Sequence, residues 1–201
     1  VIVQSVKDPD LDLVLLDKSL TIISYNNITP IIYFSKLDLL NNEELEKINT
    51  YISYYQQIGY LVSTTPVDLL SIIKEKTVVL TGQSGAGKST LLNTIDPNLN
   101  LKTAEISYAL GRGKHTTRHT ELFHTHNTFI VDTPGFSKID FIGMSNIAIR
   151  DNMKEMFDNL EYCKYQDCMH ISEDGCHVIE LVNNNKILKS RYQNYLNFIK
   201  R

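Results

Sequence analysis

The stretch TVVLTGQSGAGKSTLLNTI, residues 77 to 95, decides the fold that we expect for this chain. An apolar, β-branched segment leads directly into the pattern Gly82-x-x-x-x-Gly87-Lys88-Ser89, and a helix-forming segment follows it. This is a complete phosphate-binding loop, in which glycines let backbone N–H groups approach phosphate oxygens and the helix N-terminus adds positive potential. We expect Lys88 to reach the β- and γ-phosphates and Ser89 to ligate Mg²⁺. A chance glycine-rich turn is the alternative.

The predicted nucleotide contacts of this loop are Gly82, Gln83, Ser84, Gly85, Ala86, Gly87, Lys88, Ser89 and Thr90.

The composition is that of an ordinary globular protein, with 201 residues, 42% hydrophobic and 21% charged. This length allows one sizeable core and a small appendage. The net charge of −3 excludes a chain that is basic throughout, so any contact with RNA must come from local patches. No apolar run approaches the roughly 20 residues of a membrane span. We expect a cytoplasmic monomer that does not associate with membranes.

Predicted strands alternate with predicted helices along the first two thirds of the chain. The strands are expected at residues 1–6, 31–34, 60–64 and 77–82, and the helices at 11–20, 41–59, 66–76 and 88–95. Residues 119–135 are interpreted as two further strands around a turn. This alternation predicts a parallel, doubly wound α/β sheet. The pattern becomes helical later, so we expect a nucleotide-binding domain at 1–145 and a small helical domain at 146–201.

The segment FIVDTPGF, residues 129–136, carries a second group with phosphate chemistry. An apolar strand delivers Asp132 to the edge of the sheet, where its carboxylate can hold a water on Mg²⁺. The Gly135 N–H can contact a γ-phosphate. The Asp-x-x-Gly pattern alone is common, but it gains specificity by following an apolar strand 44 residues after Lys88 (132 − 88).

The segment GRGKHTTRHTEL, residues 111–122, lies between these two elements. Thr116 or Thr117 can complete the Mg²⁺ shell when a γ-phosphate is bound. The flanking glycines make the loop mobile, as a nucleotide switch requires. A basic surface loop is the alternative interpretation.

The base-reading residues are expected upstream, because nothing downstream resembles them. In FSKLD, residues 34–38, Lys36 and Asp38 follow a buried strand. A carboxylate can accept hydrogen bonds from N1–H and N2–H₂ of guanine, which adenine cannot offer, and a lysine stem can pack on the ring. Ser63 follows the next strand and can lie near guanine O6. Because each element needs only its place at a strand end, the order is that of a circularly permuted chain.

The order of these segments resembles the RsgA family, also called YjeQ, of circularly permuted GTPases. GRGKHTTRHTEL is the most specific of the shared segments. The resemblance implies GTP hydrolysis during maturation of the small (30S) ribosomal subunit, with GTP, GDP, the subunit and its rRNA as partners. It implies bacterial cytoplasm, or an organelle of bacterial origin, as the location. It also implies an OB-fold domain in front of the GTPase domain, and we expect no such domain within residues 1–201.

Two residues depart from common GTPase patterns. Ser35 stands where the base box usually has Asn, and the shorter side chain is expected to reduce guanine affinity. Phe136 stands where many switch GTPases have a glutamine that orients water. His115 is the candidate substitute and, with Lys88 and Thr117, completes the predicted catalytic set. A contact of His115 with RNA or solvent is the equal alternative. GTP hydrolysis by the chain alone is therefore expected to be slow, and stimulated by the small subunit.

The predicted Mg²⁺ ligands are Ser89, Thr117 and Asp132, and the remaining predicted GTP contacts are Ser35, Lys36, Asp38, Ser63 and Gly135.

The segment CKYQDCMHISEDGC, residues 163–176, holds all three cysteines of the chain. Cys163, Cys168, His170 and Cys176 form a closed tetrahedral set for one structural Zn²⁺. The family spacing favours His170 over the adjacent His177. An odd number of cysteines argues against a disulfide framework, and a chance cluster of free thiols is the alternative.

Basic and aromatic residues surround this cluster and are candidates for rRNA contact, with an ordinary solvated face as the alternative. They are Tyr162, Lys164, Tyr165, Lys186, Lys189 and Arg191.

Two other functions are compatible with parts of the sequence. A metabolic P-loop kinase would leave the threonine-rich loop unexplained. A zinc-centred RNA-binding module with a vestigial nucleotide site would not need intact Lys88, Ser89 and Asp132.

Overall fold

The structure is a computed structural model that describes residues 1–101, 120–133 and 139–200. Contacts divide the chain into two compact units. The sheet unit comprises Val1–Leu11 and Ile31–Ser137, and the helical unit comprises Asp12–Pro30 and Lys138–Arg201. Residues 12–30 therefore belong with the C-terminal helices, although they connect two strands of the sheet unit.

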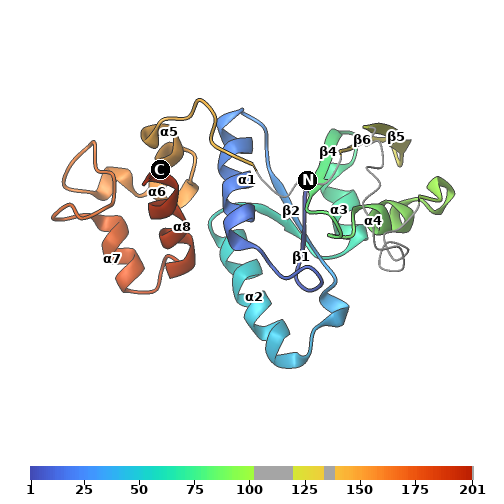
Figure 1. Ribbon diagram of the computed structural model, residues 1–201, viewed down its shortest axis with the longest axis horizontal. Helices are drawn as coiled ribbons and strands as arrows, with labels where there is room; N and C mark the ends of the chain where they lie inside the picture. The colour runs from blue at the N-terminus through green and yellow to red at the C-terminus, as the bar shows by residue number, and fades with distance from the viewer. Residues whose placement is uncertain (102–119, 134–138, 201) are drawn as a thin grey trace, which may run out of the picture. The chain divides into compact units, whose positions relative to one another are not determined.

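Six strands in the described part of the chain form one sheet, in the order β3-β2-β1-β4-β6-β5 (Figure 1). Their bounds are Ile2–Ser5 (β1), Ile31–Ser35 (β2), Leu61–Ser63 (β3), Thr77–Gly82 (β4), Glu121–Thr125 (β5) and Thr128–Asp132 (β6). The predicted doubly wound α/β sheet is confirmed. The two strands expected around a turn at 119–135 are β5 and β6, which pair antiparallel at one edge of the otherwise parallel sheet. His126 and Asn127 join these strands with φ of +46° and +57°, as a tight hairpin turn requires.

The helices of the sheet unit are α2 (Asn42–Gln57), α3 (Pro66–Ile73) and α4 (Lys88–Ile95), with short 3₁₀ turns η1 (Leu37–Leu39) and η2 (Pro97–Leu99). The N-terminus of α2 is a complete capping box. The Asn41 side chain accepts from the Glu44 N–H, and the Glu44 carboxylate accepts from the Asn41 N–H, both at 2.9 Å. Of Asn41 and Asn42, the two cap residues that the sequence favours, Asn41 is therefore the cap.

The central strands β1 and β2 are buried on both faces, as parallel strands usually are, whereas β4 and β6 expose Val79 and Phe129 on one face. Val3, Ile31 and Tyr33 pack into one core with residues of α3 and α4. Ile32 and Phe34 alternate with them along β2, point to the other face and are fully buried. This burial fixes the register of β2 and hence the position of the residues that follow it.

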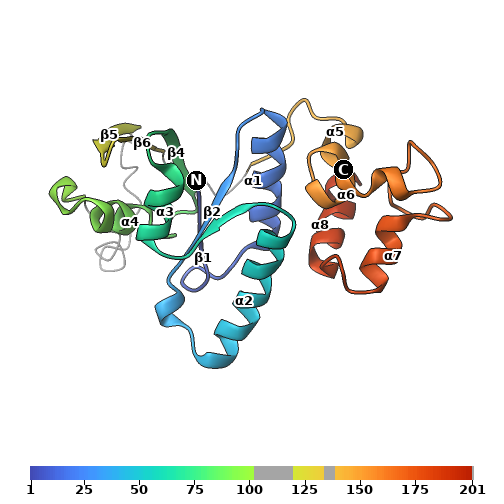
Figure 2. The ribbon, with the colours of Figure 1, turned by 180° about the vertical axis from the view of Figure 1, so that it is seen from behind.

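The helical unit contains α1 (Leu13–Tyr25), α5 (Asn146–Asp151), α6 (Lys154–Asp158), η4 (Leu160–Tyr162), α7 (His177–Asn183) and α8 (Lys189–Ile199), seen from behind in Figure 2. Its core includes Met153, Met156 and Tyr195, none of them measurably exposed. The helical segment expected at 146–160 divides into α5, α6 and η4, and Met153, in an extended conformation, separates α5 from α6. None of the helices in the described part of the chain has the length and apolar character needed to span a bilayer.

Candidate functional site

The phosphate-binding loop lies between β4 and α4, against the end of β1. A Cβ on Gly82 would come within 2.2 Å of the Val3 backbone oxygen, so only glycine fits there. Gly85 and Gly87 have φ of +79° and +92°, which favour glycine, and Gly87 is the N-cap residue of α4. The loop therefore runs close to β1 and delivers a helix N-terminus, which favours a bound anion.

Lys88 and Asp132 lie on neighbouring elements at this loop. The Lys88 ammonium donates to the backbone oxygens of Gly82 and Gln83 at 3.0 and 3.2 Å. Asp132 ends β6 and is paired in register with Leu80 of β4. Burial raises the pKa of the Asp132 carboxyl, and the Lys88 charge opposes that shift.

Two side-chain oxygens at the loop are buried and accept no hydrogen bond from the described residues. They are Oδ1 of Asp132 and Oε1 of Gln83. An unsatisfied buried acceptor is costly unless a ligand or water completes it. A carboxylate oxygen of this kind fits a hydrated Mg²⁺ that accompanies a phosphate, so the residues present suit the predicted ion.

The end of β2 is tied directly to the phosphate-binding loop. The Ser35 hydroxyl donates to the Ala86 backbone oxygen at 2.7 Å and lies 3.4 Å from the Gln4 backbone oxygen. Ser35 is 8% exposed. The shorter side chain at this position therefore retains a hydrogen bond to the loop.

The remaining base-box residues stand at the same edge of the sheet. Lys36 has φ of +64°, and its ammonium donates to the Asp8 backbone oxygen. Asp38 is exposed in η1, and its charge adds to burial in raising the pKa of Tyr33. Ser63 is buried at the end of β3 and donates to the Thr65 backbone oxygen at 2.9 Å. Ligands of doubly wound sheets bind at such carboxyl ends of strands.

Five predicted residues lie outside the described residues: His115, Thr116, Thr117, Gly135 and Phe136. Their roles stay predictions.

The second site is the Cys/His cluster of the helical unit. The ligand atoms of Cys163, Cys168, His170 and Cys176 all lie within 4.8 Å of one another. Nδ1 of His170 is 3.6 Å from the Cys163 sulfur and 3.4 Å from the Cys176 sulfur. Its Nε2 is 3.1 Å from the Met156 backbone oxygen, an outer partner that leaves Nδ1 for a metal. These four residues form a cluster with the ligand set of a metal site, while His177 pairs with Glu180 instead.

All three cysteines lie in the described part of the chain and are free thiols. Burial raises the pKa of Cys168 to about 12 and also raises the pKa of Cys176. Burial lowers the pKa of His170. A metal ligand must be thiolate or neutral imidazole, so a bound cation would displace the thiol protons.

The loop that carries the cluster is held by residues that the sequence interpretation missed. The Glu173 carboxylate accepts from the backbone N–H groups of Met169, Ile171 and Ser172, at 2.7, 2.6 and 3.0 Å. From α8, the hydroxyls of two tyrosines donate to backbone oxygens of the same loop. These bonds join Tyr192 to His170 at 2.7 Å and Tyr195 to Met169 at 2.6 Å. The helical spacing of the tyrosines was visible in the sequence, but their targets were not.

One proposed RNA contact is wrong. Arg191 is 1% exposed and ion-paired inside the helical unit, so it is not a surface cation. Lys164 pairs with Asp174 at 2.8 Å.

The phosphate-binding loop on β4 and the base-box residues on earlier strands define a P-loop nucleotide-binding protein whose sequence order is circularly permuted. The family described as RsgA GTPase matches residues 1–142. This chain is 46% identical to the Small ribosomal subunit biogenesis GTPase RsgA 2 of Oceanobacillus iheyensis, over 99% of this chain and 70% of that protein. It is 42% identical to the Small ribosomal subunit biogenesis GTPase RsgA of Enterococcus faecalis, over 99% and 69%.

Two solved structures are similar over the whole chain. YloQ, described as a circularly permuted GTPase, has 32% identity and a TM-score of 0.77, over 100% of this chain and 66% of its own. YjeQ from Thermotoga maritima has 28% identity and a TM-score of 0.78, over 99% and 69%. The chain belongs to the RsgA GTPase family, which sets aside the kinase and the vestigial-site interpretations.

Proposed function

We propose that this chain binds GTP and hydrolyses it as a switch in late maturation of the small ribosomal subunit. The names of the curated relatives support the ribosomal role, and the chain spans about 70% of their length. The single observation that carries the nucleotide role is the buried Asp132 oxygen, which has no partner among the described residues and lies beside the Lys88 ammonium and the glycine loop. We assign Lys88 to the β- and γ-phosphates, Asp38 to the guanine edge and Lys36 to the guanine face.

For the bound cation, we assign Ser89, Asp132 and Thr117 as the groups that hold Mg²⁺ with GTP, which would neutralise charge on the phosphates. His115 is assigned to orienting water, and Gly135 to the γ-phosphate. Docking on the subunit supplies the positioning that Phe136 cannot.

For the rest of the chain, we propose a GTPase domain at 1–145 and a zinc-binding domain at 146–201, in a cytoplasmic monomer. The ligand set of three thiols and one imidazole supports one structural Zn²⁺, since such closed sites leave no open position.

The test is single-turnover GTP hydrolysis with and without purified 30S subunits. We expect the subunit to accelerate hydrolysis by about tenfold or more, since a partner can complete the positioning of a phosphoryl-transfer site. His115→Ala should lose most of that gain, whereas the control His124→Ala, on exposed β5, should keep it. If wild type is not accelerated, the ribosomal role fails. If His115→Ala is accelerated as fully as wild type, only the assignment of His115 fails.

A further inference from the structure

Helix α1 belongs to one unit by its contacts and to the other by its connections. Contacts place residues 12–30 in the helical unit. In sequence, α1 connects β1 to β2, and both are central strands of the sheet unit. Two short connections therefore join α1 to the strands that carry the nucleotide site.

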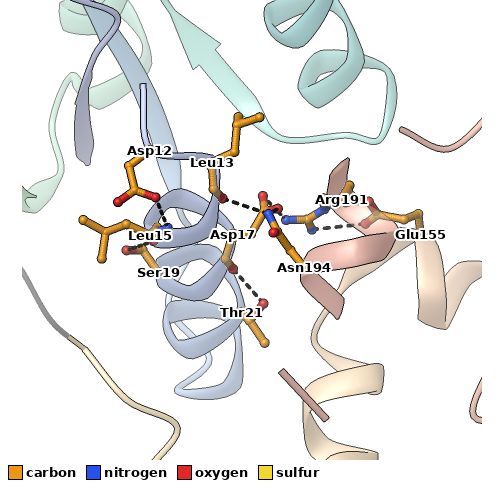
Figure 3. A network of polar contacts seen from close by, with 9 residues as sticks. All are labelled: Asp12, Leu13, Leu15, Asp17, Ser19, Thr21, Glu155, Arg191 and Asn194. Atoms are coloured by element: carbon orange, nitrogen blue, oxygen red, sulfur yellow. Dashed lines mark hydrogen bonds and ion pairs between the residues drawn. The ribbon is translucent and has the colours of Figure 1, made fainter. Parts of the chain in front are cut away.

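Buried charges lock α1 to the other helices of its unit (Figure 3). Arg191 of α8 donates to Asp17 of α1 at 2.6 Å, and to the two carboxylate oxygens of Glu155 in α6 at 2.6 and 3.1 Å. The three side chains are 1–2% exposed. Asn194 of α8 donates to the other Asp17 oxygen at 2.7 Å and lies 3.3 Å from the Leu13 backbone oxygen.

This lock is geometrically demanding. A guanidinium fixes two carboxylates at defined angles, which a single ammonium does not. Removing one member would leave a buried charge without its partner, a strongly unfavourable change. A second hydrogen bond holds α1 within the helical unit, because the Lys18 ammonium donates to the Ile139 backbone oxygen at 3.1 Å. The position of α1 within the helical unit is thus well defined.

The connection that enters α1 is bonded to the base box. In residues 6–10, the Val6 N–H donates to the Ser35 backbone oxygen at 3.2 Å, and the Lys36 ammonium donates to the Asp8 backbone oxygen. The connection therefore moves with the residues assigned to guanine.

The same connection also contacts the phosphate-binding loop. The ring carbon Cδ of Pro9 lies 3.6 Å from where a Cβ on Gly85 would stand. Only Asp10 and Leu11 separate Pro9 from Asp12, whose side chain caps α1 by accepting from the Leu15 N–H at 2.9 Å. The cap of α1 therefore follows Pro9 by only three positions in the chain.

We propose that α1 is a lever that couples nucleotide binding to the metal-bearing helical unit, with Arg191 as the positioning residue that locks α1 to that unit. A nucleotide bound between the phosphate-binding loop and the base box shifts residues 6–10, and this shift displaces α1. The coupling is reciprocal by thermodynamic necessity, so a partner that binds the helical unit changes nucleotide affinity. The lever rests on the proposed nucleotide site and describes its regulation.

The experiment is amide hydrogen exchange of the full chain, metal-loaded, with and without GDP, with GDP binding measured in parallel by a fluorescent GDP analogue. Global stabilisation by a ligand slows exchange everywhere, so α7 serves as the internal reference. We expect GDP to slow exchange in α1 by about fivefold more than in α7, the lower end of usual allosteric couplings. If GDP binds and slows exchange in α1 no more than in α7, the proposal is overturned. If GDP does not bind, the proposed nucleotide site fails instead.

Two glycines inserted between Asp10 and Leu11 should abolish the additional protection of α1 while leaving the Asp12 cap in place. The control is the same insertion between Asn184 and Asn185, in an exposed turn of the helical unit, which should keep it. Equal responses of the two insertions would overturn the proposal.

Arg191→Met should also remove the additional protection of α1, whereas Lys189→Met, an exposed residue of the same helix, should keep it. If Arg191→Met retains its fold and the full response, Arg191 is not the lock. If it unfolds the helical unit, as judged by circular dichroism, the insertion pair decides the outcome.

Discussion

The nucleotide site and the metal cluster are built on opposite plans. At the phosphate-binding loop, position depends on the backbone, as at Gly82 and Gly87, and a buried Asp132 oxygen accepts no hydrogen bond from the described residues. At the cluster, His170 Nε2 is hydrogen-bonded to the Met156 backbone oxygen, and the Glu173 carboxylate accepts from the Met169 N–H. The four ligand atoms lie within 4.8 Å of one another. The first plan suits a ligand that comes and goes, and the second suits an ion that stays. The comparison indicates that buried groups without hydrogen-bond partners mark the site of an exchangeable ligand. Supporting residues that are fully hydrogen-bonded mark the site of a structural ion.

Removing the metal should produce the largest effect. Structural zinc sites have apparent binding free energies of about 10–16 kcal/mol in isolated peptides. We expect Cys168→Ser, or a strong chelator, to unfold residues 163–176 and lower the melting temperature of the helical unit. His177→Ala is the matched control and should retain full metal content by elemental analysis. Wild-type protein that contains no zinc after gentle purification would contradict a structural role for the metal.

Asp38→Asn should change the nucleotide site without affecting the fold, because Asp38 is exposed. A site that hydrogen-bonds one edge of its ligand rejects an analogue without that edge by up to about 10⁴-fold. We expect GTP affinity to fall by about 10²-fold or more and XTP affinity to fall less, measured by competition with a fluorescent GDP analogue. Equal binding of ATP and GTP by the wild type would show that Asp38 does not read the base.

The Asp132 carboxyl should give nucleotide binding a pH dependence. Its pKa is raised, chiefly by burial. The charged form is the one that holds a cation, so Mg²⁺-dependent GDP affinity should fall as the pH drops through this raised pKa, earlier than for an ordinary aspartate. Asp132→Asn should lower Mg²⁺-dependent affinity by about tenfold, or 1.4 kcal/mol, and remove the pH dependence. A dependence that persists in Asp132→Asn would assign it to another group.

Ser35→Ala should produce the smallest effect. It removes one hydrogen bond to Ala86, worth about 1 kcal/mol, so nucleotide affinity should fall by about fivefold. Ser19→Ala is the control, since it removes a similarly buried bond in α1, at 2.7 Å from the Leu15 backbone oxygen. Both variants should lose stability by urea titration, but only Ser35→Ala should lose affinity.

Much of the fold was accessible from the sequence because local patterns dominate it. The glycine spacing at 82–87, the Asn41 cap and the cysteine spacing each depend on neighbours within a few residues. The hairpin at 119–135 was also expected, but its two-residue turn, His126–Asn127, was not, because its positive φ values are uncommon outside glycine.

The burial of Arg191 and the bond from Ser35 to Ala86 were beyond sequence reasoning. Each joins residues far apart in the chain, and periodicity gives no indication of such pairs. Asp17 and Arg191, for example, are separated by 174 positions.

The strand order has a consequence for how the protein forms during synthesis. β1, β2 and β3 are adjacent in both sequence and space, and so are β4, β5 and β6. The two half-sheets meet where β1 pairs with β4, through the partners Ile2–Thr81 and Val3–Gly82. The half that carries the base box therefore leaves the ribosome before the phosphate-binding half, and the lack of a side chain at Gly82 permits the close approach to Val3 where the two halves meet.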